Sequence, residues 1–539
     1  MSAQTATELH DLQKYRETPP ADVHISPARP TADSTSGVEE AAAAVPAVAT
    51  TTTGIHPKSR AVLIITQACG QSFFSSYCNG IVVVALPAMQ AELRLDESLL
   101  VWPSSSYFLV AGSCLLLAGS IADVAGVKKV NLAGSSLSAL AAVACGLARS
   151  SGQIIAFRAA QGLAYAIITP SSIALISNSV EEGRPRNIGF ACMGFSQPIG
   201  FCFGLILGGV FTDTVGWRPA FYLAAAASST LFLASIWALR QEPRFDSFPF
   251  IWKRLIQDID VIGIVLASIG LASISYVLAS LSADVGSIHD PATIVLIVIS
   301  GLSVPCFVAW MHRQEKNNRN ALIPNSLWRS HVFTSCCIMV LLTNGLVNCM
   351  ELYSSLFFQQ VQGLSAVRAS LQVVPSLVAG ALTSITTGFF VHRMPVLWML
   401  LAASVMSTVA PLLMAVVQID QLYWENAFFA QILAPISCDI LFTIGLLIIS
   451  DVFPKQMQGL SSAVFNTCAQ LGSAIGLSVA QLIAASVTNG STFLDKSSPD
   501  ALMKGYRVAF WTMFGWMAFV CLVCIMGMRR VGVIGVKRD

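Results

Sequence analysis

Apolar residues in this chain of 539 residues fall into long, nearly uninterrupted blocks. Most blocks hold about 20 residues, enough to cross a hydrocarbon core of about 30 Å as a helix. Inside lipid every backbone polar group needs a partner within the protein, so only helices and closed barrels can span it. The blocks lack the alternation of barrel strands. Because 55% of the residues are hydrophobic and only 11% are charged, we expect an all-α membrane protein.

The blocks predict about 14 transmembrane helices. The seventh and eighth blocks distinguish a fourteen-span protein from a twelve-span one. Residues 1–58 lack apolar periodicity and are expected to form a disordered cytosolic tail. The expected spans are 61–88, 99–119, 130–148, 153–177, 188–211, 219–239, 259–281, 292–312, 332–358, 369–390, 395–416, 426–450, 459–487 and 507–528.

Lys and Arg are distributed unevenly between the two sets of connections. If the N-terminus is cytosolic, the inside connections carry the excess, in agreement with the positive-inside rule. Both termini are therefore expected in the cytosol. The sequence Asn489-Gly490-Ser491 then lies in an outside loop, which makes Asn489 a candidate for N-glycosylation. The expected location is the plasma membrane, with the vacuolar membrane as the alternative.

A short charged connection joins the second and third predicted spans. It reads Gly119-Ser-Ile-Ala-Asp123-Val-Ala-Gly126-Val-Lys128-Lys129. The glycines permit a tight turn, and the lysines favour the cytosolic side. An ordinary cytosolic loop would carry the same lysines. The whole pattern resembles a loop signature of the major facilitator superfamily, which implies that these residues form a conformational switch latched through Asp123.

Two further stretches resemble the same family. Arg158-Ala-Ala-Gln161-Gly162 is similar to its fourth-span signature. The fifth predicted span is similar to a glycine-rich antiporter motif, although the usual Gly-Pro pair is Gly204-Leu205 here, which weakens the inference of export. Small residues at this spacing give a flat helix face for close packing. The glycines expected to pack in this way are Gly200, Gly204, Gly208 and Gly209.

Segments around Asp439 and at 458–467 and 504–507 resemble the 14-span fungal drug:proton antiporters, nearest to the branch of aminotriazole-resistance and boron exporters. This resemblance implies a major facilitator fold of two six-helix bundles plus two extra linker helices. The implied organisation is a tail at 1–58, an N-terminal bundle at 59–240, a linker with two extra helices at 241–330, a C-terminal bundle at 331–528 and a cytosolic tail at 529–539.

Polar side chains recur at helical spacing on single faces of several spans, where they are expected to line a substrate cavity. Interhelical hydrogen bonding is the alternative role. The predicted cavity residues are Gln67, Gln71, Asn79, Gln161, Asn344, Asn348, Asn466 and Gln470.

Charged residues deep in apolar spans are candidates for proton coupling. Glu351 and Asp439 are the acidic residues deepest in the predicted spans, and Arg158 is an intramembrane cation. A carboxylate shielded from water can load or release a proton as a cavity changes its opening. The alternatives are a structural acid at Asp439 and an Arg158 side chain that snorkels to the interface.

The chain contains no phosphate-binding loop for ATP, no metal-ligand cluster and no catalytic constellation, so neither an enzyme nor a cofactor is expected. Basic patches with interleaved aromatics are also missing, so no nucleic-acid partner is expected. The predicted function is proton-coupled export of a drug, a secondary metabolite or a small polar solute by a monomer in the lipid bilayer. Proton-coupled uptake of a nutrient such as ammonium or a siderophore is the alternative, and a non-transporting membrane sensor is a third possibility.

Overall fold

The computed structural model describes residues 57–96, 99–180, 183–238, 260–283, 285–317, 323–391, 393–529 and 531–532. The predictions for the N-terminal tail, for residues 239–259 of the linker and for the C-terminal tail beyond residue 532 lie outside these ranges.

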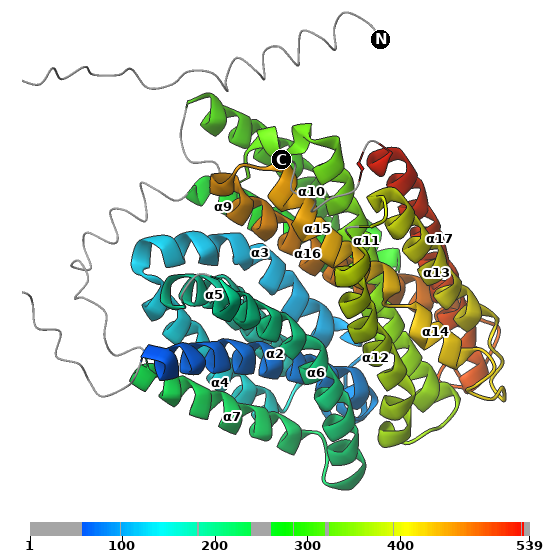
Figure 1. Ribbon diagram of the computed structural model, residues 1–539. Coiled ribbons are helices and arrows are strands. Elements are labelled where there is room, and N and C mark those ends of the chain that lie inside the picture. Colours follow the sequence, from blue (N-terminus) through cyan, green and yellow to red (C-terminus); the bar gives the residue numbers. More distant parts are fainter. Residues whose placement is uncertain are drawn as a thin grey trace, which may run out of the picture. The chain divides into compact units, whose positions relative to one another are not determined.

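Long apolar helices make up almost all of the described chain (Figure 1). The first half contains α2 (Pro57–Leu93), α3 (Trp102–Ala125), α4 (Val127–Leu147), α5 (Ser151–Ser179), α6 (Arg184–Thr214) and α7 (Arg218–Ala238). A helix pair follows, α9 (Val261–Ala283) and α10 (Pro291–Lys316). The second half contains α11 (His331–Leu356) with the π-helical turn η4 (Phe357–Val361), α12 (Ala366–Phe390), α13 (Val396–Val416), α14 (Ala427–Leu433), α15 (Ile436–Val452), α16 (Lys455–Asn489) and α17 (Pro499–Met528).

Each predicted span falls on one helix except the twelfth, which falls on two. Within the described residues, 13 helices are long and apolar enough to cross a membrane. The seventh predicted span corresponds to α9, a helix of 23 residues in which a shorter apolar stretch is described. The twelfth span is broken between α14 and α15 at Pro435, because proline cannot donate the hydrogen bond that would continue the helix.

The two halves repeat one packing scheme. In the first half α2 packs on α6, α3 on α5 and α4 on α7; in the second half α11 packs on α16, α12 on α14 and α15, and α13 on α17. The halves meet where α3 packs on α16 and α6 packs on α12, and α9 contacts both α16 and α3. This is the arrangement of two six-helix bundles with an added helix pair, as predicted, and duplicated bundles are expected of a transporter.

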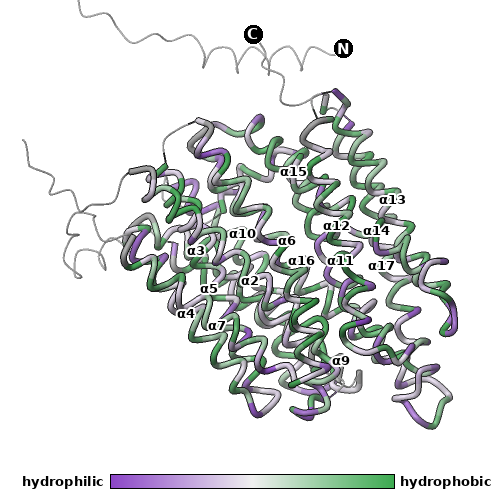
Figure 2. Tube along the Cα trace, turned by 60° about the horizontal axis from the view of Figure 1, so that its bottom comes forward, coloured by the Kyte–Doolittle hydropathy of each residue, from purple (hydrophilic) through white to green (hydrophobic). Residues whose placement is uncertain are grey.

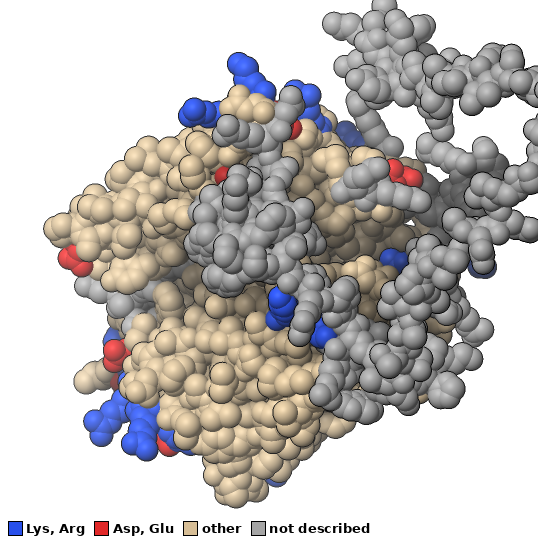
Figure 3. Space-filling view, turned by 90° about the vertical axis from the view of Figure 1, so that its left-hand side faces the viewer, with Lys and Arg blue, Asp and Glu red and all other residues tan. Residues whose placement is uncertain are grey.

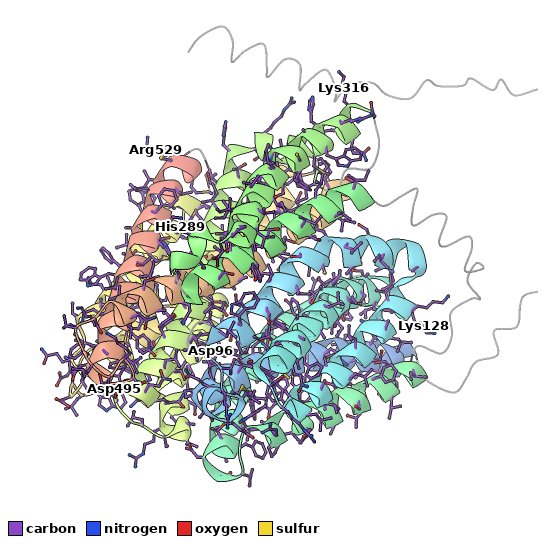
Figure 4. The ribbon with its side chains drawn as sticks, turned by 180° about the vertical axis from the view of Figure 1, so that it is seen from behind. Asp96, Lys128, His289, Lys316, Asp495 and Arg529 are labelled. Atoms are coloured by element: carbon purple, nitrogen blue, oxygen red, sulfur yellow. The ribbon has the colours of Figure 1, made fainter. Side chains whose placement is uncertain are left out.

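The helices have two distinct ends. We call the end with the α3–α4 turn the Lys129 end, and the end where α6 finishes the Asp213 end. Figure 4 shows Lys128, Lys316 and Arg529 toward the first, and Asp96, His289 and Asp495 toward the second.

Outward-facing apolar side chains cover the sides of both bundles and of the added helix pair. Leu140, Val304 and Leu382 are 67%, 65% and 58% exposed, respectively. Hydrophilic segments gather mainly at the helix ends in Figure 2. Such a broad exposed apolar band is the surface that lipid would cover.

Candidate functional site

A narrow cavity lies in the seam between the two bundles. It brings Asn79 of α2 and Asn348 of α11 to the same place from opposite halves of the chain. On the face shown in Figure 3, most of the described surface is neither basic nor acidic. The cavity is lined by Asn79, Val83, Ser104, Phe108, Phe201, Asn348, Leu352 and Leu477.

Arg158 of α5 is completely buried at the first bundle's side of this seam. Its Nε donates to the Pro103 carbonyl (2.8 Å), its Nη1 to Gln161 Oε1 (2.6 Å) and its Nη2 to Asn79 Oδ1 (2.5 Å). Its guanidinium also lies 4.7 Å from the centre of the Tyr107 ring. The described residues give it no carboxylate partner. The snorkelling interpretation is therefore wrong, and Arg158 is a buried cation held by neutral groups and an aromatic face.

The polar stripe of α2 divides into two roles. Gln67 donates to Asn131 Oδ1 (2.9 Å), and Asn131 donates to Ser171 and Ser172 (3.0 Å each). Gln67 thus fits the interhelical interpretation rather than cavity lining. Gln71 is 1% exposed, and neither of its amide atoms has a partner among the described residues. An unpaired buried amide is costly, so Gln71 has capacity for a polar solute.

The amide side chains of the second bundle differ in what they contact. Asn348 Nδ2 donates to Ser473 Oγ of α16 (3.0 Å) and also contacts the seam cavity. Asn344 and Asn466 each donate to a carbonyl one turn earlier in their own helix (3.3 and 2.9 Å). Asn344, Asn348 and Asn466 are all partly exposed, and Asn348 is the one of the three that lines the seam cavity.

Two carboxylates lie inside the second bundle. Glu351 of α11 is 7% exposed. Asp439 of α15 is partly exposed, and its carboxylate packs against Gly380 of α12. The two groups are close enough to interact electrostatically, and no described residue donates a hydrogen bond or forms an ion pair with either. Two like charges near each other in an apolar bundle repel, so uptake of one proton removes the repulsion.

Hydrogen bonds between the bundles are concentrated at the Asp213 end. One lies nearer the middle, where Gln470 Nε2 of α16 reaches the Tyr165 hydroxyl of α5 at 3.4 Å. The bonds at the Asp213 end run from Ser105 to Ala474 O and Ser478, from Ser355 to Val83 O, from Gln359 to Val84 O, from Gln360 to Gln90, and from the amides of Ala366 and Val367 to Asp213.

A proline explains why α2 offers backbone acceptors to the second bundle. Pro87 lies inside α2 and has no N–H, so the Val83 carbonyl one turn earlier loses its helical donor. Ser355 Oγ donates to the Val83 carbonyl (3.1 Å), and Gln359 Nε2 donates to the Val84 carbonyl (3.0 Å). The second bundle therefore supplies a donor to the Val83 carbonyl, which the proline leaves available, and another to the neighbouring Val84 carbonyl.

A larger cavity of about 290 Å³ lies at the Asp213 end. Gln90 of α2 borders it from the first bundle, and Gln360, Gln481 and Tyr506 border it from the second. The Tyr506 hydroxyl donates to Gln360 Oε1 (2.6 Å), and Gln360 Nε2 donates to Gln90 Oε1 (3.3 Å). The lining groups are amides, hydroxyls and apolar side chains, so this vestibule has no charged wall.

The glycines of α6 serve two different contacts. At Gly200 and Gly204 an added Cβ would collide with the backbone carbonyls of Phe73 and Tyr77 in α2, and Gly208 also packs on α2. Gly209 lies on another face, where an added Cβ would be 3.0 Å from the Ala366 carbonyl of α12. The single packing face that we predicted is therefore corrected: three glycines hold the first bundle together, and Gly209 lies between the bundles.

The second half has an equivalent glycine contact that the sequence reasoning missed. An added Cβ at Gly472 of α16 would collide with the Leu341 carbonyl of α11, and at Gly476 it would be 2.8 Å from Gly345 Cα. The four-residue spacing of Gly472 and Gly476 is the sequence signal that could have identified it. The α11–α16 pair thus packs by the same means as the α2–α6 pair.

The predicted switch forms an even tighter turn than expected. Helix α3 continues to Ala125 and α4 begins at Val127, so Gly126 alone makes the turn, with φ of 97°. This conformation strongly favours glycine. Gly119 is not tightly packed, since an added Cβ would only reach ordinary contact at 3.8 Å. Lys128 and Lys129 lie in the first turn of α4, and the Asp123 side chain lies outside the described part.

Asn489 is the last residue of α16 and is exposed at the Asp213 end. Ser491 of the same sequon is 7% exposed.

Comparison with known proteins identifies the protein family of this chain. The family model of the Major Facilitator Superfamily matches residues 68–477 and 371–534. Together with the two bundles and the polar seam, this match shows that the chain belongs to the Major Facilitator Superfamily, whose members here are transporters and not enzymes.

The relatives narrow this to a branch that includes drug-efflux proteins. The chain is 36% identical to "MFS-type transporter 1" of Pyricularia oryzae, over 89% of this chain and 85% of that protein. It is 27% identical to the "Low affinity ammonium transporter" of Saccharomyces cerevisiae, over 77% of this chain and 78% of that protein. It is 25% identical to "Efflux pump terJ" of Aspergillus terreus, over 84% of each chain.

A solved structure agrees on the fold. A bacterial homologue of the human lysosomal transporter Spinster, in an inward-facing and unoccupied conformation, superposes with a TM-score of 0.61. The match covers 88% of this chain and 98% of that one at 12% identity. The family membership and the many apolar helices show that the chain is a multi-pass membrane transporter that acts on small molecules.

Proposed function

We propose that this protein is a proton-coupled exporter of small molecules that works by alternating access. The observation that carries the proposal is the pair of carboxylates, Glu351 and Asp439, inside the second bundle. The two carboxylates interact with each other, and neither has a cationic partner among the described residues. In this cycle the Lys129 end faces the cytosol and takes up substrate while the cross-bundle bonds keep the Asp213 end closed. Opening of the Asp213 end then releases the substrate.

The carboxylate pair supports a proton as the driving ion. A pair of like charges inside an apolar bundle favours binding of one proton, and release of that proton becomes favourable when water reaches the site. Glu351 lies one turn from Asn348, which contacts the seam cavity. Proton occupancy on this face of α11 and substrate occupancy of the seam can therefore influence each other.

The seam supports a small polar substrate. Asn79 and Asn348 present amides from both bundles, and Gln71 has both amide atoms without partners among the described residues. Amides both donate and accept, so they suit neutral solutes with hydroxyl or amide groups. Arg158 lies behind Asn79 and holds that amide's oxygen, which directs the Asn79 amide toward its donor role. The export of a drug or metabolite is also in keeping with the relative named as an efflux pump.

Uptake is the second candidate, favoured by the relative that is named as an ammonium transporter. The replacement of the usual Gly-Pro pair by Gly204-Leu205 also favours this direction. The same fold and the same carboxylates would serve uptake if substrate and proton moved together. We further propose a monomer in the plasma membrane, with both termini in the cytosol.

The test is a compound-accumulation assay in cells that express or lack the protein, with and without a protonophore. Export predicts that expression lowers the cellular level of at least one compound and that the protonophore or Asp439→Asn abolishes the difference. Asp451→Asn is the matched control, because Asp451 is exposed on the same helix, α15. Higher accumulation in expressing cells would support uptake, and efflux unaffected by protonophore and by both Asp439→Asn and Glu351→Gln would refute proton coupling.

A further inference from the structure

We infer that Asp213 is a gating residue, which holds the Asp213 end closed by capping a helix of the opposite bundle. Asp213 lies in the last turn of α6, in the first bundle. Its Oδ1 accepts a hydrogen bond from the Ala366 amide (3.0 Å) and its Oδ2 accepts one from the Val367 amide (2.9 Å). These two amides begin α12, in the second bundle. A single carboxylate thus ties the two bundles together with both of its oxygens.

The start of α12 is suited to a negative charge. The first amides of a helix have no partner within the helix, and the helix dipole places partial positive charge there. No described cation forms an ion pair with Asp213, so the α12 N-terminus is the group that balances it. Hydrogen bonds to an ionised acceptor are about twice as strong as neutral ones. The cross-bundle hydrogen bonds donated by Ser105, Ser355, Gln359 and Gln360 at the same end use neutral side chains.

Helix α12 already has a cap within its own bundle. The effect of losing this local cap can therefore be compared with the effect of losing the contact from Asp213. Ser365 Oγ accepts a hydrogen bond from the Arg368 amide (3.4 Å). Asp213 therefore completes the end of α12 from outside its own bundle. Gly209 lies one turn earlier on α6. A Cβ added at Gly209 would be 3.0 Å from the Ala366 carbonyl oxygen of α12. This close approach of α6 to α12 is what places the carboxylate at the amides.

Opening of this end must break both bonds at once. The Asp213 carboxylate would then gain water, but the Ala366 and Val367 amides would lose their charged partner. Removal of the carboxylate should lower the cost of opening without touching Glu351, Asp439 or the seam cavity. The inference rests on the proposed alternating-access cycle, but its test needs neither a substrate nor a pH gradient, so its failure can be told from failure of the transport proposal.

The test is hydrogen–deuterium exchange of the purified full chain in lipid nanodiscs, read by mass spectrometry. We expect Asp213→Ala to raise exchange about tenfold at 362–370 and also at 355–361 and 101–106, which lie on both sides of the closed end. Ser365→Ala removes only the local cap and should raise exchange only near 365–370. Asp420→Asn changes an exposed carboxylate at the same end and should leave every segment as in the wild type.

The pattern of exchange decides the inference. If Asp213→Ala behaves like Ser365→Ala, with a change confined to the start of α12, Asp213 is only a helix cap and the inference is wrong. The inference also fails if Asp213→Ala changes no segment. Asp213→Asn keeps one acceptor oxygen and should give an intermediate rise in the same three segments, which guards against a variant that simply folds poorly.

Discussion

Replacing Pro87 by alanine should weaken the closed state at the Asp213 end. The alanine would supply the N–H that proline lacks, and this N–H would compete for the Val83 carbonyl that now accepts from Ser355. Proline is expected to bend a helix, so its loss should also withdraw the Val84 carbonyl from Gln359. Hydrogen bonds between membrane helices average about 0.6 kcal/mol. Loss of both bonds therefore costs about 1.2 kcal/mol, or about an eightfold rise in the ratio of open to closed molecules.

The assay is hydrogen–deuterium exchange at 355–361 and 474–485, which face α2 and α3 but do not contain the substitution. Ser355→Ala alone should give about a threefold rise, since it removes one bond of about 0.6 kcal/mol. Pro87→Ala should have a smaller effect in the Ser355→Ala background, because the two changes act on the same carbonyl. Pro411→Ala in α13 is the control, since Pro411 is also inside a helix but lies away from the seam. Full additivity of Pro87→Ala and Ser355→Ala, or an equal effect of Pro411→Ala, would refute the reasoning.

Two further predictions concern the first bundle. Gly204→Ala should destabilise the protein by about 1–3 kcal/mol, because its Cβ meets the Tyr77 carbonyl in α2. Gly194→Ala, with open space around it inside the same helix, should not lower the unfolding temperature. Equal unfolding temperatures for the two variants would contradict the packing that we describe. Arg158→Lys should lower stability by about 1–3 kcal/mol for each acceptor left unpaired, because one ammonium cannot reach the Pro103, Gln161 and Asn79 oxygens as the guanidinium does. Wild-type stability and transport in the Arg158→Lys variant would show that this network is dispensable.

Much of the fold could be predicted from the sequence because lipid imposes a simple rule on helix length. The apolar blocks matched the helices, including α9, and the residues of the loop at 119–129 were enough to indicate the family that the comparison shows. The Gly126 turn also followed from its residues, since a positive φ requires glycine in so short a connection.

The roles of single polar residues were harder to predict, because periodicity shows that residues share a face but not what that face meets. Gln67 and Gln71 are one turn apart on α2, yet Gln67 meets Asn131 and Gln71 meets no polar partner among the described residues. The same limit applies to Gly208 and Gly209, which are adjacent in sequence but pack on helices of different bundles. Asp213 and Pro87 gave no sequence signal, because their partners lie more than a hundred residues away in the other half of the chain.

The most direct test of the central claim is proton movement in proteoliposomes that contain the purified protein and a trapped pH-sensitive dye. The substrate is the compound identified by the accumulation assay, added outside with no initial pH difference. Antiport predicts that substrate entry drives protons out, so the lumen becomes alkaline, and that Asp439→Asn abolishes this signal while Asp451→Asn preserves it. Substrate entry without a change in lumen pH, or with acidification of the lumen, would contradict proton-coupled export.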